Sequence, residues 1–339
     1  MSAIIRTFKL GQPPWPTLDP FLFCVHHNDE YPAANIEMHP KSSLMGRNIG
    51  SDFSGKDGWS MYHGTGVPGF PSHPHRGFET VTLARKGYID HSDSLGAKAR
   101  FGHGDVQWMT AGSGVVHSEM FPLLNQDSPN HTELFQIWLN LPQKSKMVSP
   151  YFTMFWSEKI PQFIETDALG NETQLTLIAG AFPPYISPPP PPNSWASEPD
   201  SHLAIWTIEL GANSSWSLPA SVPGLNRVLY FFKGNSITLN DQQILKGHGI
   251  QLHSDQKVKI QNGDKPSEIL LLQGRPIGEP VAKYGPFVMN TEQEIRQAMM
   301  DYQRTQFGGW PWDRRDPVHG RDPKRFAIHV DGKTEFADG

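Results

Sequence analysis

Glycine and proline interrupt this chain so often that it has little room for long regular helices. Each residue type accounts for 31 of the 339 residues, and both stop helices and mark turns. Between them lie short apolar runs, such as FETVTLA at 78–84, LFQIWLNL at 134–141 and LAIWTIEL at 203–210. Short strand-like runs separated by turns are typical of β-sandwiches and barrels. The sequence therefore predicts an all-β chain.

One segment near the C-terminus has the signals of an amphipathic helix. Thr291 and Glu294 have the spacing of a capping box, which satisfies free backbone N–H groups at the start of a helix. The apolar residues that follow lie on one stripe, at positions i, i+3, i+4 and i+7: Ile295, Ala298, Met299 and Tyr302. We therefore expect few helices, with one C-terminal helix among them.

The length of the chain indicates more than one domain. A chain of 339 residues is too long for one typical domain and sufficient for two. The stretch from Pro142 to Pro150 is polar and bounded by prolines, which is typical of a joint. We expect a first domain over residues 1–142, a second over residues 143–290, and the helix with a charged tail over residues 291–339.

Two further segments each have two interpretations. The five consecutive prolines Pro188–Pro192 favour polyproline II and cannot occupy a central strand. They predict a stiff surface loop or, alternatively, a docking site for an aromatic groove. The tail after Gly309 is either ordered against the body through Trp310 and Trp312, or partly loose.

Charge and cysteine content indicate the compartment and exclude some partners. The net charge of -5 argues against a nucleic-acid binder with a large basic surface. Cys24 is the sole cysteine, so no internal disulfide can form, which fits a reducing compartment. The first residues lack the pattern of a secretory signal, and no apolar stretch reaches the roughly 18 residues of a membrane helix. We expect a cytoplasmic protein, or a nuclear one in a eukaryote, that binds neither nucleic acid directly nor membranes.

Histidines cluster in the first half of the chain, in a pattern that suits a metal ion. His73 and His75 are two residues apart, and about forty residues later His117 and Glu119 have the same spacing. In a strand, side chains i and i+2 point to the same face. Two such pairs on neighbouring strands would place three imidazoles and a carboxylate around one ion.

The donor types narrow the choice of metal without fixing it. Neutral imidazole and carboxylate suit Fe, Mn, Co, Ni, Cu or Zn. Either pair alone is a weak signal, whereas two pairs separated by a strand–turn–strand segment, with turns at Gly87 and Gly104, are a strong one. The sequence predicts one divalent metal ion in the first domain, with coordination positions left open for a substrate or dioxygen.

The motifs around these residues resemble those of a known family. HPHRGFETVT at 73–82 and GDVQWMTAGSGVVHSEM at 104–120 are similar to the two cupin motifs in the form that pirins have. FQIWLNLP at 135–142 and GPFVMNTEQEI at 285–295 resemble pirins as well. The resemblance spans roughly residues 15 to 305. It implies two tandem cupin domains, each a double-stranded β-helix or jelly roll.

The resemblance also implies roles for single residues. The metal ligands of pirins correspond to His73, His75, His117 and Glu119 in this sequence. Glu79, a ligand position in many other cupins, is not one in pirins, and we expect a paired strand carboxylate there. The family's usual ion is Fe(II), and the second domain is expected to hold no metal.

The first functional hypothesis is an enzyme. Several pirins are credited with quercetin 2,3-dioxygenase activity, so the resemblance implies a small aromatic, flavonol-like substrate and O2. Glu119 could accept the substrate's hydroxyl proton as general base. Gln136 and Trp138 share one face of the strand expected at 134–141 and could line the pocket. The candidate pocket walls are Phe78, Trp108, Met109 and Phe135.

The second hypothesis is a regulatory protein without catalysis. Family members are described as redox-sensitive, iron-dependent partners of transcription factors or metabolic enzymes. In that role the oxidation state of the ion would change the affinity for a protein partner. Such a function needs two conformations of one element, which a sequence does not reveal.

Overall fold

The structure is a computed structural model that describes residues 2–337. The chain divides into two compact units, each assembled from two separate stretches. Unit 1 contains residues 2–24 and 158–278, and unit 2 contains residues 25–157 and 279–337. These limits differ from the expected boundaries at residues 142 and 290. The reason is that the N-terminal strand pairs within unit 1, whereas the C-terminal helix and tail pack within unit 2.

Unit 2 consists mainly of two antiparallel sheets. The first has the order β10 (Tyr151–Phe155), β7 (Asp105–Thr110), β4 (Phe78–Lys86), β9 (Asn130–Asn140) and β2 (Phe21–Tyr31). The second has the order β26 (Thr334–Phe336), β25 (Phe326–Ile328), β6 (Lys98–Gly102), β5 (Tyr88–Asp93), β8 (Val115–Met120) and β3 (Gly69–His75). A two-stranded sheet of β23 (Ala282–Tyr284) and β24 (Phe287–Met289) completes the unit.

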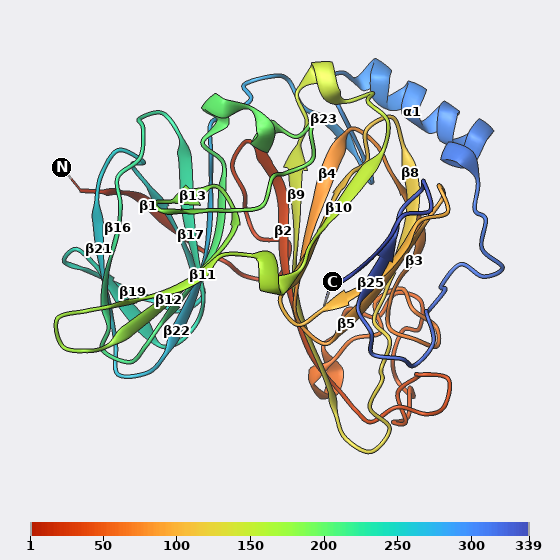
Figure 1. Cartoon of the computed structure of the whole chain (residues 1–339), viewed down its shortest axis with the longest axis horizontal. Coiled ribbons are helices and arrows are strands. Elements are labelled where there is room, and N and C mark those ends of the chain that lie inside the picture. Colours follow the sequence, from red (N-terminus) through yellow and green to blue (C-terminus); the bar gives the residue numbers. More distant parts are fainter. Residues whose placement is uncertain (1, 338–339) are drawn as a thin grey trace. The chain divides into compact units, whose positions relative to one another are not determined.

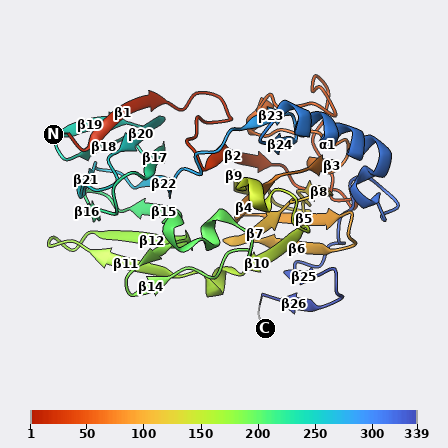
Figure 2. The same ribbon diagram turned by 90° about the horizontal axis from the view of Figure 1, so that it is seen from above.

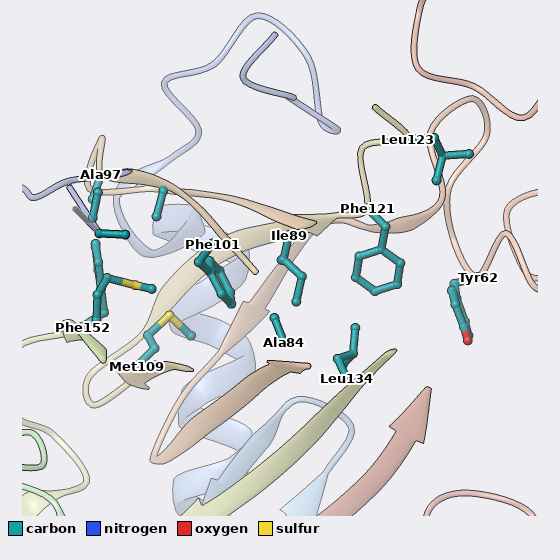
Figure 3. Close-up of a cluster of buried hydrophobic side chains, with 14 of the residues drawn as sticks. Tyr62, Ala84, Ile89, Ala97, Phe101, Met109, Phe121, Leu123, Leu134 and Phe152 are labelled. Carbon is teal, nitrogen blue, oxygen red and sulfur yellow. The ribbon is translucent and has the colours of Figure 1, made fainter. Parts of the chain in front are cut away.

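The core of unit 2 lies between its two sheets. Ala84, Met109 and Leu134 come from the five-stranded sheet, and Ile89 and Phe101 come from the six-stranded sheet (Figure 3). Each is at most 2% exposed. Because successive strand residues point to opposite faces, these positions also fix which neighbours face the interior. Thr82 on β4 and Gln136 on β9 are two residues from core residues, so they face inward as well.

Unit 1 is built on the same plan. A seven-stranded sheet has the order β1 (Ile4–Lys9), β20 (His248–Leu252), β17 (Asn226–Lys233), β22 (Ser267–Gly274), β15 (Ala204–Leu210), β12 (Glu172–Ala179) and β11 (Gln162–Thr166). A four-stranded sheet has the order β16 (Ser215–Leu218), β21 (Val258–Asn262), β18 (Ser236–Leu239) and β19 (Gln242–Leu245). Between them, Leu177, Leu229 and Leu271 belong to a buried aliphatic core. A short hairpin of β13 (Ala181–Phe182) and β14 (Tyr185–Ile186) follows β12 in the sequence.

Helix α1 (Glu292–Thr305) is the one α-helix among residues 2–337, and Figure 1 shows it in blue. Its first turn has the predicted capping box between Thr291 and Glu294, and Ile295 and Ala298 are buried. The prediction of an all-β chain with a single C-terminal helix is confirmed. No helix in the described part of the chain is long and apolar enough to cross a membrane. Short 3-10 turns lie at Lys56–Gly58, Gln143–Ser145, Ser157–Lys159, Trp195–Ser197, Pro199–Ser201 and Gln306–Gly308.

The tail after Gly309 is ordered against unit 2, which decides between its two interpretations. The indole nitrogen of Trp312 donates a hydrogen bond to the carbonyl oxygen of Asp93 at 2.9 Å. Farther along, β25 pairs with β6 and β26 pairs with β25, so the tail extends the six-stranded sheet (Figure 2). Pro188–Pro192 form a loop of unit 1, as predicted.

Candidate metal centre

Three histidines meet where β3 and β8 pair. The two strands are antiparallel, with His73 opposite His117, and His75 follows on β3. One ring nitrogen from each of the three side chains lies within 4.8 Å of the others. The ring centroids of His73 and His117 are 4.5 Å apart, and those of His75 and His117 are 4.9 Å apart. The predicted convergence of these three side chains is confirmed.

The hydrogen bonds of these rings leave several ring nitrogens suited to bind a metal ion. Nδ1 of His73 lies 2.9 Å from the carbonyl oxygen of Pro71. Because a carbonyl can only accept, Nδ1 carries the proton and Nε2 keeps a lone pair. Nδ1 of His75 and both ring nitrogens of His117 are buried without a hydrogen-bond partner in residues 2–337. An unsatisfied buried polar atom costs about 1–3 kcal/mol, and a cation bound to the lone-pair nitrogen of each ring would remove this cost for that nitrogen.

Burial also keeps the three rings neutral. It lowers the pKa of His73 to about 4, and it lowers the pKa of His75 and His117 well below the usual value. The neighbouring His73 lowers the last two further. Neutral imidazole is the form that binds metals. The residues present therefore fit a transition-metal ion.

Glu119 lies near this group without being part of it. Its side chain is buried, and its carboxylate is held from the opposite sheet. The hydroxyl of Thr82 donates to Oε1 at 2.9 Å, and the amide of Gln136 donates to Oε2 at 3.1 Å. Burial raises the pKa of Glu119, although these two hydrogen bonds oppose the shift. Glu119 as a fourth ligand remains a prediction.

His91 and Thr82 are site residues that the sequence did not single out. His91 is fully buried on β5, opposite Glu119 on β8, and its ring centroid lies 5.5 Å from that of His117. Its Nε2 is 3.2 Å from Oδ2 of Asp93. The i, i+2 pair of His91 and Asp93 was the one local signal that could have pointed to a buried pair here.

The side chains predicted to line the pocket lie in three different places. Phe78 and Trp138 lie against His75, at centroid distances of 5.0 Å and 5.4 Å. Met109 belongs to the core of unit 2. For Trp108 and Phe135 the prediction is wrong, because each is adjacent in sequence to an inward-facing residue and so faces the other side of its sheet. Their rings contact Phe155 and His26 instead.

Glu79 is a paired strand carboxylate, as expected. It is fully buried and accepts a hydrogen bond from the Thr110 hydroxyl at 2.6 Å. It does not hold Arg76, which pairs with Asp301 at 2.9 Å and lies over the ring of Phe307.

Three side chains at the histidine group are less buried than the rest. His75 and His117 are buried, but His73, Gln136 and Trp138 are only partly buried.

Comparison with known proteins assigns the family. Residues 9–139 match the Pirin family, and residues 205–308 match the pirin C-terminal cupin domain. Mouse pirin is 34% identical over 254 residues, which cover 71% of this chain and 78% of that protein. This chain belongs to the pirin family. Units 1 and 2 are therefore the two cupin domains of a pirin, and the tail after residue 308 lies beyond the matched regions.

Other relatives of this pirin have names that refer to an activity. A Vibrio cholerae protein named provisionally as a quercetin 2,3-dioxygenase is 36% identical over 241 residues, covering 71% of this chain and 80% of that protein. A solved structure of quercetin 2,3-dioxygenase from Acinetobacter baumannii aligns with a TM-score of 0.70 at 27% identity. That alignment covers 91% of this chain and 99% of the other.

Proposed function

We propose that this pirin is a metal-dependent oxygenase of the quercetin 2,3-dioxygenase type. In this reaction a flavonol ring is opened by O2, both oxygen atoms enter the ester product, and one ring carbon leaves as carbon monoxide. The observation that carries the proposal is the group of three converging histidines, which burial keeps neutral. The names of the Vibrio and Acinetobacter proteins support the choice of reaction.

The proposed ligands are His73, His75, His117 and Glu119, and the proposed ion is Fe(II). Three nitrogen donors and one oxygen donor suit several divalent metals, including Mn, Co, Ni, Cu and Zn. Glu119 lies two residues after His117 on β8, so its carboxylate points to the same face of that strand as the His117 ring. When bound, the ion would supply Lewis acidity that lowers the pKa of the substrate's hydroxyl.

Residues of the chain would supply the remaining steps. Glu119 would accept the hydroxyl proton as general base, since its burial favours the protonated carboxyl. Thr82 and Gln136 would hold the carboxyl in place during that transfer. The rings of Phe78 and Trp138 beside His75 would hold a flat aromatic substrate and exclude water.

The test begins with metal analysis of the purified protein, followed by loading with Fe(II), Mn(II), Co(II), Ni(II) or Cu(II). Loss of quercetin absorbance under oxygen, with carbon monoxide released, is the expected result for at least one ion. His75→Ala should abolish both metal binding and turnover, whereas Glu119→Gln should abolish turnover. His131→Ala, at a partly exposed histidine of unit 2, is the matched control and should change neither.

Two outcomes would contradict the proposal in different ways. A protein that binds no metal in any condition contradicts the metal centre itself. A protein that binds metal through His75 but turns over no flavonol favours the alternative, an iron-dependent redox-sensing regulator that binds a transcription factor or a metabolic enzyme.

A further inference from the structure

Unit 1 contains a cavity of about 890 Å³ that lies apart in sequence from the metal centre. Its walls come from the ends of β12, β15, β17 and β22, and from the loop that carries the proline run. Cavities of roughly 300–1,000 Å³ are the size that holds small organic ligands. The proline run therefore forms part of a wall.

Two polar side chains enter this cavity from strands whose other inward residues are apolar. Arg227 precedes Leu229 by two positions on β17, and Gln273 follows Leu271 by two positions on β22, so both face the barrel interior. They are opposite each other in the strand register. Arg227 is 2% exposed and Gln273 is 6% exposed. A buried arginine at the end of an apolar barrel is costly unless its charge has a partner.

The hydrogen bonds of Arg227 leave part of its guanidinium unused. Nε donates to Oε1 of Gln273 at 2.6 Å, and Nη1 donates to the carbonyl oxygen of Pro219 at 2.9 Å. Nη2 has no hydrogen-bond partner in residues 2–337. Burial lowers the pKa of Arg227 to about 10, so the group remains charged at neutral pH. The two partners that it has are neutral, so a cation with free N–H groups lines the cavity.

The carboxylates that could neutralise the charge of Arg227 belong to exposed or partly exposed residues. Asp255 is exposed and raises the pKa of Arg227, against the effect of burial. Glu198 lines the cavity and is partly exposed. Neither forms an ion pair with Arg227.

The remaining walls combine flat apolar surfaces with polar side chains such as Ser187, Ser201 and His202. The apolar surfaces include Phe182, the prolines Pro188–Pro190 and Trp206. The indole N–H of Trp206 already donates to the carbonyl oxygen of Ala179 at 3.0 Å, so this side chain offers its ring rather than a donor. A ligand would thus meet aromatic and proline surfaces along its body and one cationic group at the end.

We propose that this cavity is a second ligand site, which binds a small planar aromatic carboxylate through Arg227. A carboxylate matches the planar guanidinium by charge-assisted hydrogen bonds, and an aromatic body matches the walls. The site is independent of the proposed oxygenase reaction, because its residues belong to unit 1 and the histidine group belongs to unit 2.

The probes are 2-naphthoate and its neutral isostere 2-naphthamide, titrated calorimetrically into the full-length protein. We expect naphthoate to bind about ten-fold or more tightly than naphthamide, because only the acid can pair with Arg227. The indole ¹⁵N–H signal of Trp206, assigned with Trp206→Phe, should shift on binding. His75→Ala should bind naphthoate equally well, which separates this site from the metal centre.

Variants of the arginine decide the role of its charge. Arg227→Met should remove the preference for the acid, whereas Arg6→Met, at an exposed arginine of the same unit, should leave it intact. If Arg227→Met does not fold, Arg227→Lys keeps the charge and should retain a smaller preference for the acid. Equal affinity of the wild-type protein for both probes, or no shift of the Trp206 signal, would overturn the proposal.

Discussion

Glu133 is a buried carboxylate whose charge depends on three basic neighbours in unit 2. Burial alone would raise its pKa, but the hydrogen bond from His26 and the charges of Arg85 and Lys86 lower it to about 2. Because the pKa is lower in the folded state than the ordinary 4.5, the ionised group stabilises the fold above that pH. This contribution is lost as the pH falls from 4.5 towards 2.

The first prediction concerns this pH range. Glu133→Gln should lower the stability of the protein at pH 7, and its difference from the wild type should shrink as the pH falls from about 5 to 3. Urea unfolding midpoints measured across this range test it. Glu37→Gln, at an exposed glutamate, should give the wild-type curve, and a difference for Glu133→Gln that stays constant with pH would contradict the assignment.

The second prediction concerns the amide that holds Glu119. Gln136→Leu removes the hydrogen bond to Oε2 of that carboxylate. Loss of a group that orients a metal-site residue typically lowers affinity or activity by about 10–100-fold. Competition with a chromogenic chelator measures the affinity, and Gln243→Leu on the exposed part of β19 is the control. Unchanged affinity and turnover would mean that Glu119 has no part in the centre.

The sequence predicted these single residues unevenly. The histidines of β3 and β8 were found because each spacing of two already fixes a common strand face. Thr82 was missed because its partners, Glu119 and Gln136, lie on other strands far away in sequence. His91 was not chosen from among the other histidines, because its position beside His117 depends on strand pairing. Trp108 and Phe135 were assigned to the wrong face, since a fully buried strand has apolar residues on both sides and no alternation to indicate which is inside.

At the scale of elements, helix α1 depends on its capping box. The Thr291 hydroxyl accepts from the backbone N–H of Glu294, and the Glu294 carboxylate accepts from the backbone N–H of Thr291 at 2.8 Å. Thr291→Ala should destabilise unit 2 by about 1 kcal/mol, because a helix N–H loses its partner. Gln293→Ala, at an exposed position of the first turn, should change stability by less than about 0.5 kcal/mol. Chemical denaturation followed by circular dichroism compares the two, and equal effects would contradict the role of the cap.

The tail gives a second prediction at this scale. Arg100 on β6 is fully buried and pairs with Asp90 through two hydrogen bonds of 2.7 Å and 2.6 Å. Its remaining N–H groups donate to the tail carbonyl oxygens of Gly320 and Asp322. Arg100→Met should cost about 3–5 kcal/mol, because the Asp90 carboxylate stays buried without its cation.

The control for this variant is an arginine–aspartate pair on the surface. Arg304 contacts Asp301 at 3.1 Å, and its side chain is 76% exposed. Arg304→Met should cost less than about 1 kcal/mol. Thermal melting of both variants provides the comparison. A small effect for Arg100→Met would mean that the tail does not need this arginine to stay on the sheet.

Elements with strong local signals were predicted well, and assemblies of distant elements were not. The capping box and apolar stripe identified α1 because both are encoded within a few residues. The pairing of β1 with β20, and of β25 with β6, depends on which open sheet edge a strand meets in the folded chain. The local sequence does not indicate which edge a strand will pair with. For this reason the expected domain boundaries differ from the limits of the two units.

At the scale of the whole molecule, the two units should respond differently to metal. A ligand that binds only the folded state stabilises it by RT ln(1 + [L]/Kd), about 2.7 kcal/mol at 100-fold excess over Kd. The backbone amides of β3 and β8 in unit 2 should therefore exchange their hydrogens more slowly when the ion is added. Mass spectrometry measures this exchange. Strands β15 and β22 of unit 1 should exchange at the same rate with and without the ion. If exchange slows only in β15 and β22, the ion binds in unit 1, which would contradict the proposed metal centre in unit 2.

The pairing of Ile4 with Leu252 also has a consequence for biosynthesis. Strand β1 is translated long before its partner β20, because most strands of unit 2 lie between them in the sequence. The six-stranded sheet of unit 2 is completed later still, because β25 and β26 follow β20 in the sequence. A nascent chain therefore keeps β1 unpaired until β20 has been translated, and one edge of β6 unpaired until β25 has been translated. A gene cut between the two cupin regions would separate strands of both units from their partners.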